Sequence, residues 1–161
     1  GSSMKRIHAL ALSGACLCLL WAFTALAPGL RTVHAPYQYP DPDQSRNMSS
    51  YTWKARCEIP EDLLPRLSTP ALVETVLNYP RGTEILVNAS SEVSAFLVLA
   101  QFNGVQELLR RPDGMALLQE AYGDMGLEDQ VAGRAGIAAT LLSGAAAVQE
   151  LGCPLDQLLP P

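Results

Sequence analysis

The sequence of 161 residues is 48% hydrophobic and 17% charged, which allows one domain with a modest core. Three of its eleven basic residues, Lys5, Arg6 and Arg31, precede Pro36, whereas all sixteen acidic residues follow it. The chain from Pro36 onward therefore carries a net charge of about −8. This acidity argues against nucleic acid as a partner, since nucleic acids bind clustered lysine and arginine, and against adhesion to an anionic membrane surface.

The N-terminus has the pattern of a secretory signal. Residues 1–3 are typical of an expression scar, and a basic pair then precedes an apolar run over residues 7–27. We therefore expect a signal peptide or anchor over residues 4–29. Cleavage after Gly29 is favoured. The alternative cuts, each followed by a proline, are after Ala27 and Ala35.

Two other interpretations of this segment remain open. The apolar run is long enough to cross a bilayer of roughly 30 Å as an uncleaved anchor. Alternatively, Cys16 is the lipidated residue of a lipoprotein. With the basic pair on the cytoplasmic side, the rest of the chain lies outside the cytoplasm whether the signal is cleaved or kept. We expect a protein that is secreted or held on the extracellular face of the membrane.

Two cysteines lie beyond the signal, Cys57 and Cys153. In an exported domain, two cysteines most simply form one disulfide bond. Closing a loop of about 96 residues would stabilise the fold by up to ~4–5 kcal/mol in the chain-entropy model. The alternative is two free, buried thiols. No metal site is expected here, because no further ligand stands at a suitable spacing and no histidine follows His34.

Residues 30–50 are rich in proline and polar residues and show no hydrophobic periodicity. We expect a flexible linker in which Tyr37 and Tyr39 are mobile, and the alternative is that these two tyrosines pack back on the domain. The alternating polar residues from Asp41 to Asn47 are similar to the start of a calcium loop, but Arg46 stands where the sharp turn needs glycine. We therefore predict no calcium site.

A helical domain is predicted over residues 51–161, and its clearest element is a helix over residues 69–79. Ser68 or Thr69 can cap its start, Pro70 suits its first turn, and Pro80 ends it. Its apolar stripe comprises Leu72, Val73, Val76 and Leu77, and its solvated face Glu74, Thr75 and Asn78. Asn78 is singled out, because an asparagine at a helix end often fixes a turn through side-chain hydrogen bonds.

On either side of this helix the signals are weaker. Trp53 is expected to fix the lead-in to the core, as a short helix or an extended segment. Residues 81–87 are compatible with a helix or a strand, because the run is too short for periodicity to decide. A helix is predicted over residues 91–102. Its expected core residues are Val93, Phe96, Leu97, Leu99 and Ala100.

Three more helices are predicted, over residues 105–111, 113–122 and 128–151. Asp113 is expected to cap the second. The third is rich in alanine and glycine, which allows close packing against neighbours. Because glycine is a weak helix former, we expect a break near Ser143-Gly144.

No catalytic, cofactor-binding or metal-ligating residue is predicted. The sequence contains no Gly-x-Ser-x-Gly elbow, no His-Glu-x-x-His motif and no phosphate-binding glycine loop. Glu120 with Asp124, and Glu128 with Asp129, are carboxylates that could act as a pair. Acidic residues spaced in this way usually lie on solvated faces, so neither pair is predicted to be a site.

Three blocks of sequence carry a resemblance: residues 57–64 (CEIPEDLL), 67–80 (LSTPALVETVLNYP) and 101–113 (QFNGVQELLRRPD). Together they resemble a group of uncharacterised exported helical proteins of Gram-positive bacteria. The resemblance covers roughly residues 53–122 and implies an exported bacterial protein. It implies no activity and no functional residues.

The sequence thus predicts an all-α fold, a small bundle or short solenoid of five or six short helices. For function, we expect a non-catalytic extracellular binding or interaction module that recognises a protein or another cell-envelope partner through a patch or groove. One alternative is a cell-envelope hydrolase that uses acidic residues, which requires two convergent carboxylates with raised pKa values. The other is a membrane-tethered accessory subunit, anchored by residues 7–27.

Overall fold

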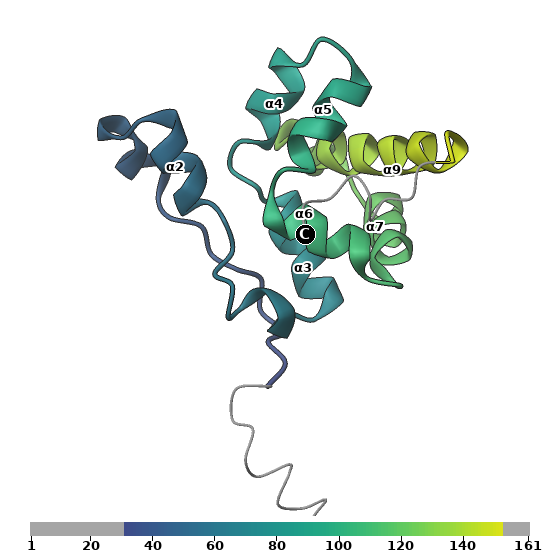
Figure 1. The fold of residues 1–161 in the computed structure, drawn as a ribbon, viewed down its shortest axis with the longest axis horizontal. Coiled ribbons are helices and arrows are strands. Elements are labelled where there is room, and N and C mark those ends of the chain that lie inside the picture. The colour runs from purple at the N-terminus through teal and green to yellow at the C-terminus, as the bar shows by residue number, and fades with distance from the viewer. Residues whose placement is uncertain (1–30, 153–161) are drawn as a thin grey trace, which may run out of the picture. The chain divides into compact units, whose positions relative to one another are not determined.

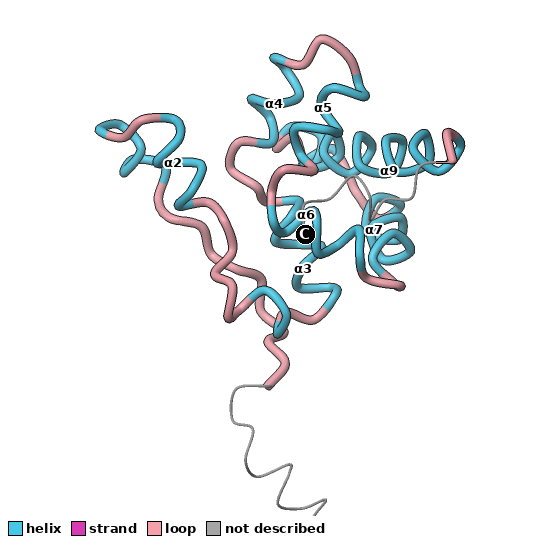
Figure 2. The backbone as a smooth tube through the Cα atoms, viewed as in Figure 1, coloured by secondary structure: helices cyan, strands magenta, loops and turns pink. Residues whose placement is uncertain are grey.

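The computed structural model describes residues 31–152, and the regular structure in this range is helical (Figure 1 and Figure 2). The α-helices are α2 (Ser50–Arg56), α3 (Thr69–Leu77), α4 (Gly82–Asn88), α5 (Glu92–Leu99), α6 (Asn103–Arg110), α7 (Gly114–Gly123), α8 (Leu127–Val131) and α9 (Arg134–Glu150). Two 3-10 helices, η2 (Pro42–Asn47) and η3 (Leu64–Arg66), accompany them. The all-α prediction is confirmed, but this range alone holds more helices than the five or six expected.

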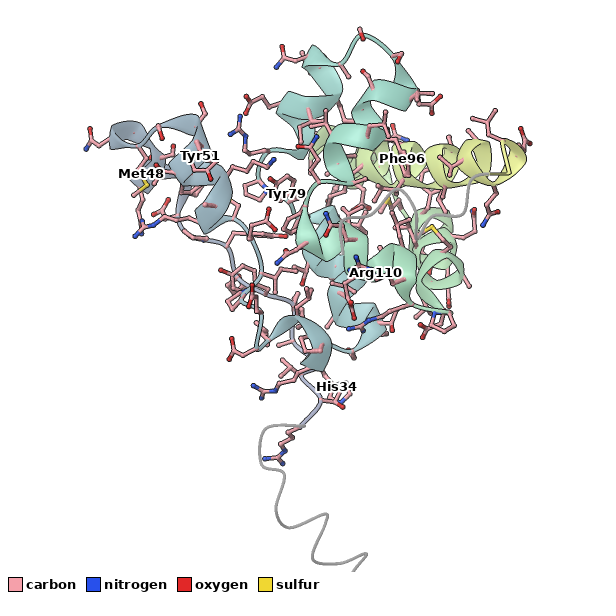
Figure 3. All side chains as sticks on the ribbon, in the orientation of Figure 1. His34, Met48, Tyr51, Tyr79, Phe96 and Arg110 are labelled. Carbon is pink, nitrogen blue, oxygen red and sulfur yellow. The ribbon has the colours of Figure 1, made fainter. Side chains whose placement is uncertain are left out.

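Helix α9 lies at the centre of the packing. It contacts α3, α4, α5, α7 and α8, and it is the yellow helix in Figure 1. Small residues allow this close approach: a Cβ added to Gly144 would lie 2.2 Å from Cγ of Phe96 on α5. Figure 3 shows Phe96 beside α9. The predicted break near Ser143-Gly144 is wrong, because burial of this glycine against an aromatic ring offsets its weak helix propensity.

The break lies earlier, at Gly133, and it divides the predicted helix 128–151 into α8 and α9. Gly133 has a φ of +78°, in the left-handed region that favours glycine. This turn brings Asp129 on α8 back to Arg134, the first residue of α9, whose Nε donates to Oδ1 of the aspartate at 2.8 Å. The change of direction therefore creates an ion pair as well as a second helix.

Helix α3 confirms the predicted helix over residues 69–79. The Ser68 hydroxyl oxygen accepts a hydrogen bond from the Ala71 N–H at 3.3 Å, as expected of an N-cap. Leu72 and Val76 are fully buried. Thr75, expected on the solvated face, is also buried. Its hydroxyl donates to the Ala71 carbonyl at 2.7 Å, which satisfies the polar atom inside the core.

Part of the predicted flexible linker is packed against the domain. The Tyr37 N–H donates to the Thr75 hydroxyl oxygen at 2.9 Å, and the Tyr39 hydroxyl donates to the Thr75 carbonyl at 2.6 Å. Tyr39 also makes ring contacts with Tyr79 and Phe102. Burial raises the pKa of Tyr39. The expectation of mobile tyrosines is therefore wrong, because long-range partners hold both residues.

The same segment is fixed at a second point by an isolated parallel bridge between Val33 and Leu67. The Val33 N–H donates to the Arg66 carbonyl at 2.7 Å, and the Ser68 N–H donates to the Val33 carbonyl at 2.8 Å. Further along, the lead-in forms helix α2, and its Trp53 is buried as predicted. The packed domain therefore begins well before residue 51.

Residues 57–64 and 101–113, two of the sequence blocks distinguished above, meet in space. The Asn103 side chain donates to the Ile59 carbonyl at 2.7 Å and accepts from the Ile59 N–H at 3.0 Å. The Asn103 N–H in turn donates to Oε2 of Glu58 at 2.9 Å. Glu58 thereby caps α6, whose own N-cap residue, Phe102, supplies no side-chain hydrogen bond.

Other predictions have mixed outcomes. Of the undecided residues 81–87, residues 82–87 fall in helix α4 and Arg81 is its N-cap. Asp113 precedes α7 without a capping side-chain bond, and its carboxylate instead accepts from the Thr69 hydroxyl at 3.1 Å. Val93 and Leu97, expected in the core, are 56% and 47% exposed.

The predicted signal or anchor over residues 4–29 lies outside the described residues, as does Cys153. Within residues 31–152, no helix combines the length and hydropathy needed to cross a membrane.

Candidate binding groove

A groove of about 450 Å³ lies where α3, the end of α7, α8 and the start of α9 meet. Its apolar lining consists of Pro70, Val73, Leu117, Ala121 and Met125. Its charged lining consists of Glu74, Glu120, Asp124, Asp129 and Arg134. The groove therefore joins an apolar surface to a rim with four carboxylates and one guanidinium.

Arg134 holds the groove together through all three of its guanidinium nitrogens. Nη2 donates to Oε2 of Glu74 on α3 at 2.9 Å, and Nη1 donates to Oδ1 of Asn78 at the end of α3. Nε donates to Oδ1 of Asp129 on α8. One planar group thus ties three helices together, which matches the fixed fork geometry of arginine.

The charges of this cluster support one another. The Gly126 N–H and the Arg134 guanidinium donate to the Asp129 carboxylate and hold its pKa below the usual value. Burial disfavours the charge on Arg134, but the hydrogen bonds to Glu74 and Asp129 outweigh this and raise the pKa of the arginine. Asp129 and Arg134 therefore both keep their charges at neutral pH.

The other two carboxylates of the groove, Glu120 and Asp124, lie at the end of α7. Within residues 31–152, neither side chain makes an ion pair or a hydrogen bond with another residue. Asp124 is the C-cap of α7, and no basic residue lies in the last turn of this helix. Negative charge at a helix C-terminus opposes the helix dipole, and like charges four residues apart repel each other. Among residues 31–152, both carboxylates therefore lack an ion-pair partner.

A second hollow, of about 320 Å³, lies between α4 and α5. Its one charged lining residue, Glu84, pairs with Arg81 at 2.8 Å. This hollow offers no uncompensated charge for a ligand, so the groove beside α7 is the stronger candidate.

Only some of the residues singled out in the sequence line the groove. Glu120 and Asp124 both line the groove, whereas of the second pair only Asp129 does so.

Cys57 is fully buried, and burial raises the pKa of its thiol. Because Cys153 lies outside the described residues, the disulfide bond Cys57–Cys153 stays a prediction. Among residues 31–152, no three His, Cys, Asp or Glu side chains are close enough to hold a metal ion.

Sequence reasoning missed the central role of Arg134 and Glu74. Asn78 was expected to fix its own turn, but its side-chain oxygen instead accepts a hydrogen bond from Arg134, 56 positions away. The local signal was a polar residue at a helix end. The partner could not be predicted, because it depends on the change of direction at Gly133.

The pKa directions of Glu58 and Asp129 bear on whether either carboxyl group could act as a general acid. Burial raises the pKa of Glu58, partly offset by the hydrogen bond from the Asn103 N–H. This residue caps α6 and does not line the groove. Asp129, which does line it, has a lowered pKa. A general acid in the groove would need a raised one.

Comparison with known proteins gives no further guide: no family model matches the sequence, and neither the curated proteins nor the solved structures yielded a match.

Proposed function

We propose that the protein is a non-catalytic, exported binding module that docks a segment of a partner protein in the groove between α3, α7, α8 and α9. The observation that carries this proposal is the groove itself. An apolar lining lies directly beside two carboxylates that form no ion pair within the described part of the chain, and Arg134 fixes the surrounding helices. Ligand sites typically combine an apolar surface with a few placed polar groups.

The architecture supports a preformed site. The packing of α9 against five neighbouring helices favours a small bundle over a short solenoid. The groove then lies on packed helices instead of on a long loop. A site on such elements loses little conformational freedom when a ligand binds.

The alternative of a cell-envelope hydrolase receives less support. It requires two carboxylates that converge in a cleft with raised pKa values. Asp129 is held ionised by its hydrogen bonds, and Glu58 is occupied in capping α6. Export itself is supported by the basic and apolar pattern of residues 4–29.

Selection of peptides tests the proposal. A random dodecapeptide library displayed on phage would be selected against the full chain. Selected peptides are then measured against Ala121→Trp, which fills the groove, and against Ala55→Trp, which adds the same bulk on the exposed face of α2. Met125→Ala, which removes part of the apolar lining without adding volume, serves as a second groove variant.

We expect the selected peptides to lose binding to Ala121→Trp, to weaken with Met125→Ala and to be unaffected by Ala55→Trp. Thermal unfolding of each variant verifies the fold. Failure to enrich any peptide, or peptides that bind all four proteins equally, would refute the groove as the docking site.

A further inference from the structure

We infer that the occupant of the groove is a peptide segment that carries a lysine or arginine side chain next to an apolar one. This inference rests on the proposed function and specifies its ligand. The cationic group would lie between Glu120 and Asp124, and the apolar side chain would lie on Leu117, Ala121 and Met125.

The first argument is charge. The five ionisable residues of the groove sum to −3, and Arg134 is already bonded to Glu74 and Asp129. The uncompensated charge is therefore concentrated at the two carboxylates of α7. A cation is complementary to this place, whereas a carboxylate or phosphate ligand would be repelled.

The second argument is the direction of α7. Both carboxylates lie in the last turn or at the C-cap, where the carbonyl groups add partial negative charge. The side chains and the backbone therefore both contribute negative electrostatic potential at this point. A lysine or arginine in the ligand would compensate both at once, and charge-assisted hydrogen bonds to carboxylates are among the stronger contacts in recognition.

The third argument is the apolar lining. Leu117 and Ala121 lie one turn apart on α7, and Ala121 is three residues before Asp124. The apolar positions are therefore on the same helix as the carboxylates. Lysine and arginine have apolar stems below their charged ends, so a basic side chain can itself cover part of this surface. A simple metal ion would leave the apolar lining uncovered.

Four labelled octapeptides test the inference by fluorescence anisotropy on the full chain. Each octapeptide contains two copies of a charged or polar residue and two copies of a second residue, in a glycine–serine background. The first combines lysine with leucine, the second glutamate with leucine, the third glutamine with leucine, and the fourth lysine with serine. We expect the lysine–leucine peptide to bind about tenfold tighter than each of the others.

Two matched double variants locate the contact. Glu120→Gln with Asp124→Asn removes two charges from the groove. Glu61→Gln with Asp62→Asn removes two charges from an exposed turn outside it, so both variants have the same net charge. We expect the lysine–leucine peptide to bind the first variant about tenfold or more weakly than it binds wild type. Its affinity for the second variant should differ from that for wild type by less than about twofold.

The outcomes separate the two proposals. If the leucine peptides bind irrespective of their charge, and Ala121→Trp abolishes this binding, the proposal of a basic ligand is refuted while the proposed function of the groove stands. If both double variants weaken binding equally, the attraction is to the net charge of the protein and the assigned contact is wrong. If none of the four peptides binds while phage-selected peptides do, the ligand class is wrong. If no peptide of either kind binds, both proposals fail.

Discussion

Nη2 of Arg134 donates to Oε2 of Glu74 at 2.9 Å, and this contact joins the first residue of α9 to the middle of α3 across 60 positions of sequence. The same guanidinium bonds to Asp129 on α8. Because α3, α8 and α9 all border the groove, its shape depends on this one side chain. Replacement of Arg134 should therefore affect stability and ligand binding together.

We predict that Arg134→Met lowers the free energy of unfolding by about 1–2 kcal/mol, because two carboxylates and the Asn78 amide lose their donor. The loss stays modest because the arginine side chain is still 20% exposed and water replaces part of the interaction. Urea unfolding at pH 7 measures it. Arg46→Met is the control: its ion pair with Asp43 is 79% and 76% exposed, so its removal should change stability by less than about 0.5 kcal/mol. Equal losses in the two variants would contradict a structural role for Arg134.

The Asp129 carboxylate should give stability a defined pH dependence. Its pKa is lowered in the folded protein, first by the Gly126 N–H and then by Arg134, so the folded state binds the proton less readily than the unfolded chain does. This contribution is fully present above the unfolded pKa of roughly 3.9 and is lost as the pH falls through the folded value. Urea unfolding of wild type and Asp129→Asn should therefore differ most near pH 6, and the difference should shrink only as the pH falls below roughly 3.9 and through the lowered folded pKa. A difference that grows towards acid pH would show that the sign is wrong.

The sequence was most informative where structure depends on neighbouring residues. The start of α3 was predictable because Ser68 and Pro70 act on the backbone within one turn. The buried face of α5 was predictable only in part. Phe96 and Leu99 are buried as expected, but this helix is apolar on nearly every side, so periodicity could not show that Val93 and Leu97 are exposed.

Features that depend on distant partners could not be predicted. Tyr37 and Tyr39 lie in a segment whose composition is typical of a linker, and their partner Thr75 is more than 30 residues away. The groove has the same difficulty. Glu120 and Asp124 were recognisable as a helical pair, but the sequence could not show that the apolar surface of Val73 on α3 lies beside them.

Gly144→Ala should destabilise the protein through overpacking. The added Cβ would lie 2.2 Å from Cγ of Phe96, and the ring must move within the core to make room. We expect the free energy of unfolding to fall by about 1–3 kcal/mol, measured by urea unfolding. Gly123→Ala at the end of α7 is the matched control, because nothing lies within 4 Å of its added Cβ. That variant should be neutral or stabilised by up to ~1 kcal/mol, since alanine is the better helix former. A tolerated Gly144→Ala would mean that α5 and α9 are less closely packed than described.

Removal of the two groove carboxylates of α7 should stabilise the protein. Glu120→Gln with Asp124→Asn relieves the repulsion between acids four residues apart and removes negative charge from the helix C-terminus, which is worth about 0.5–1 kcal/mol in total. The gain in thermal stability should shrink as sodium chloride is added, because salt screens exposed charges.

Glu61→Gln with Asp62→Asn, at the same net charge, should give a smaller gain, since neither residue lies at a helix C-terminus. A loss of stability in the groove variant would mean that the two carboxylates have partners in the folded protein. A gain combined with weaker binding of the lysine–leucine peptide would mean that these acids reduce stability in favour of ligand recognition, as expected of residues retained for binding.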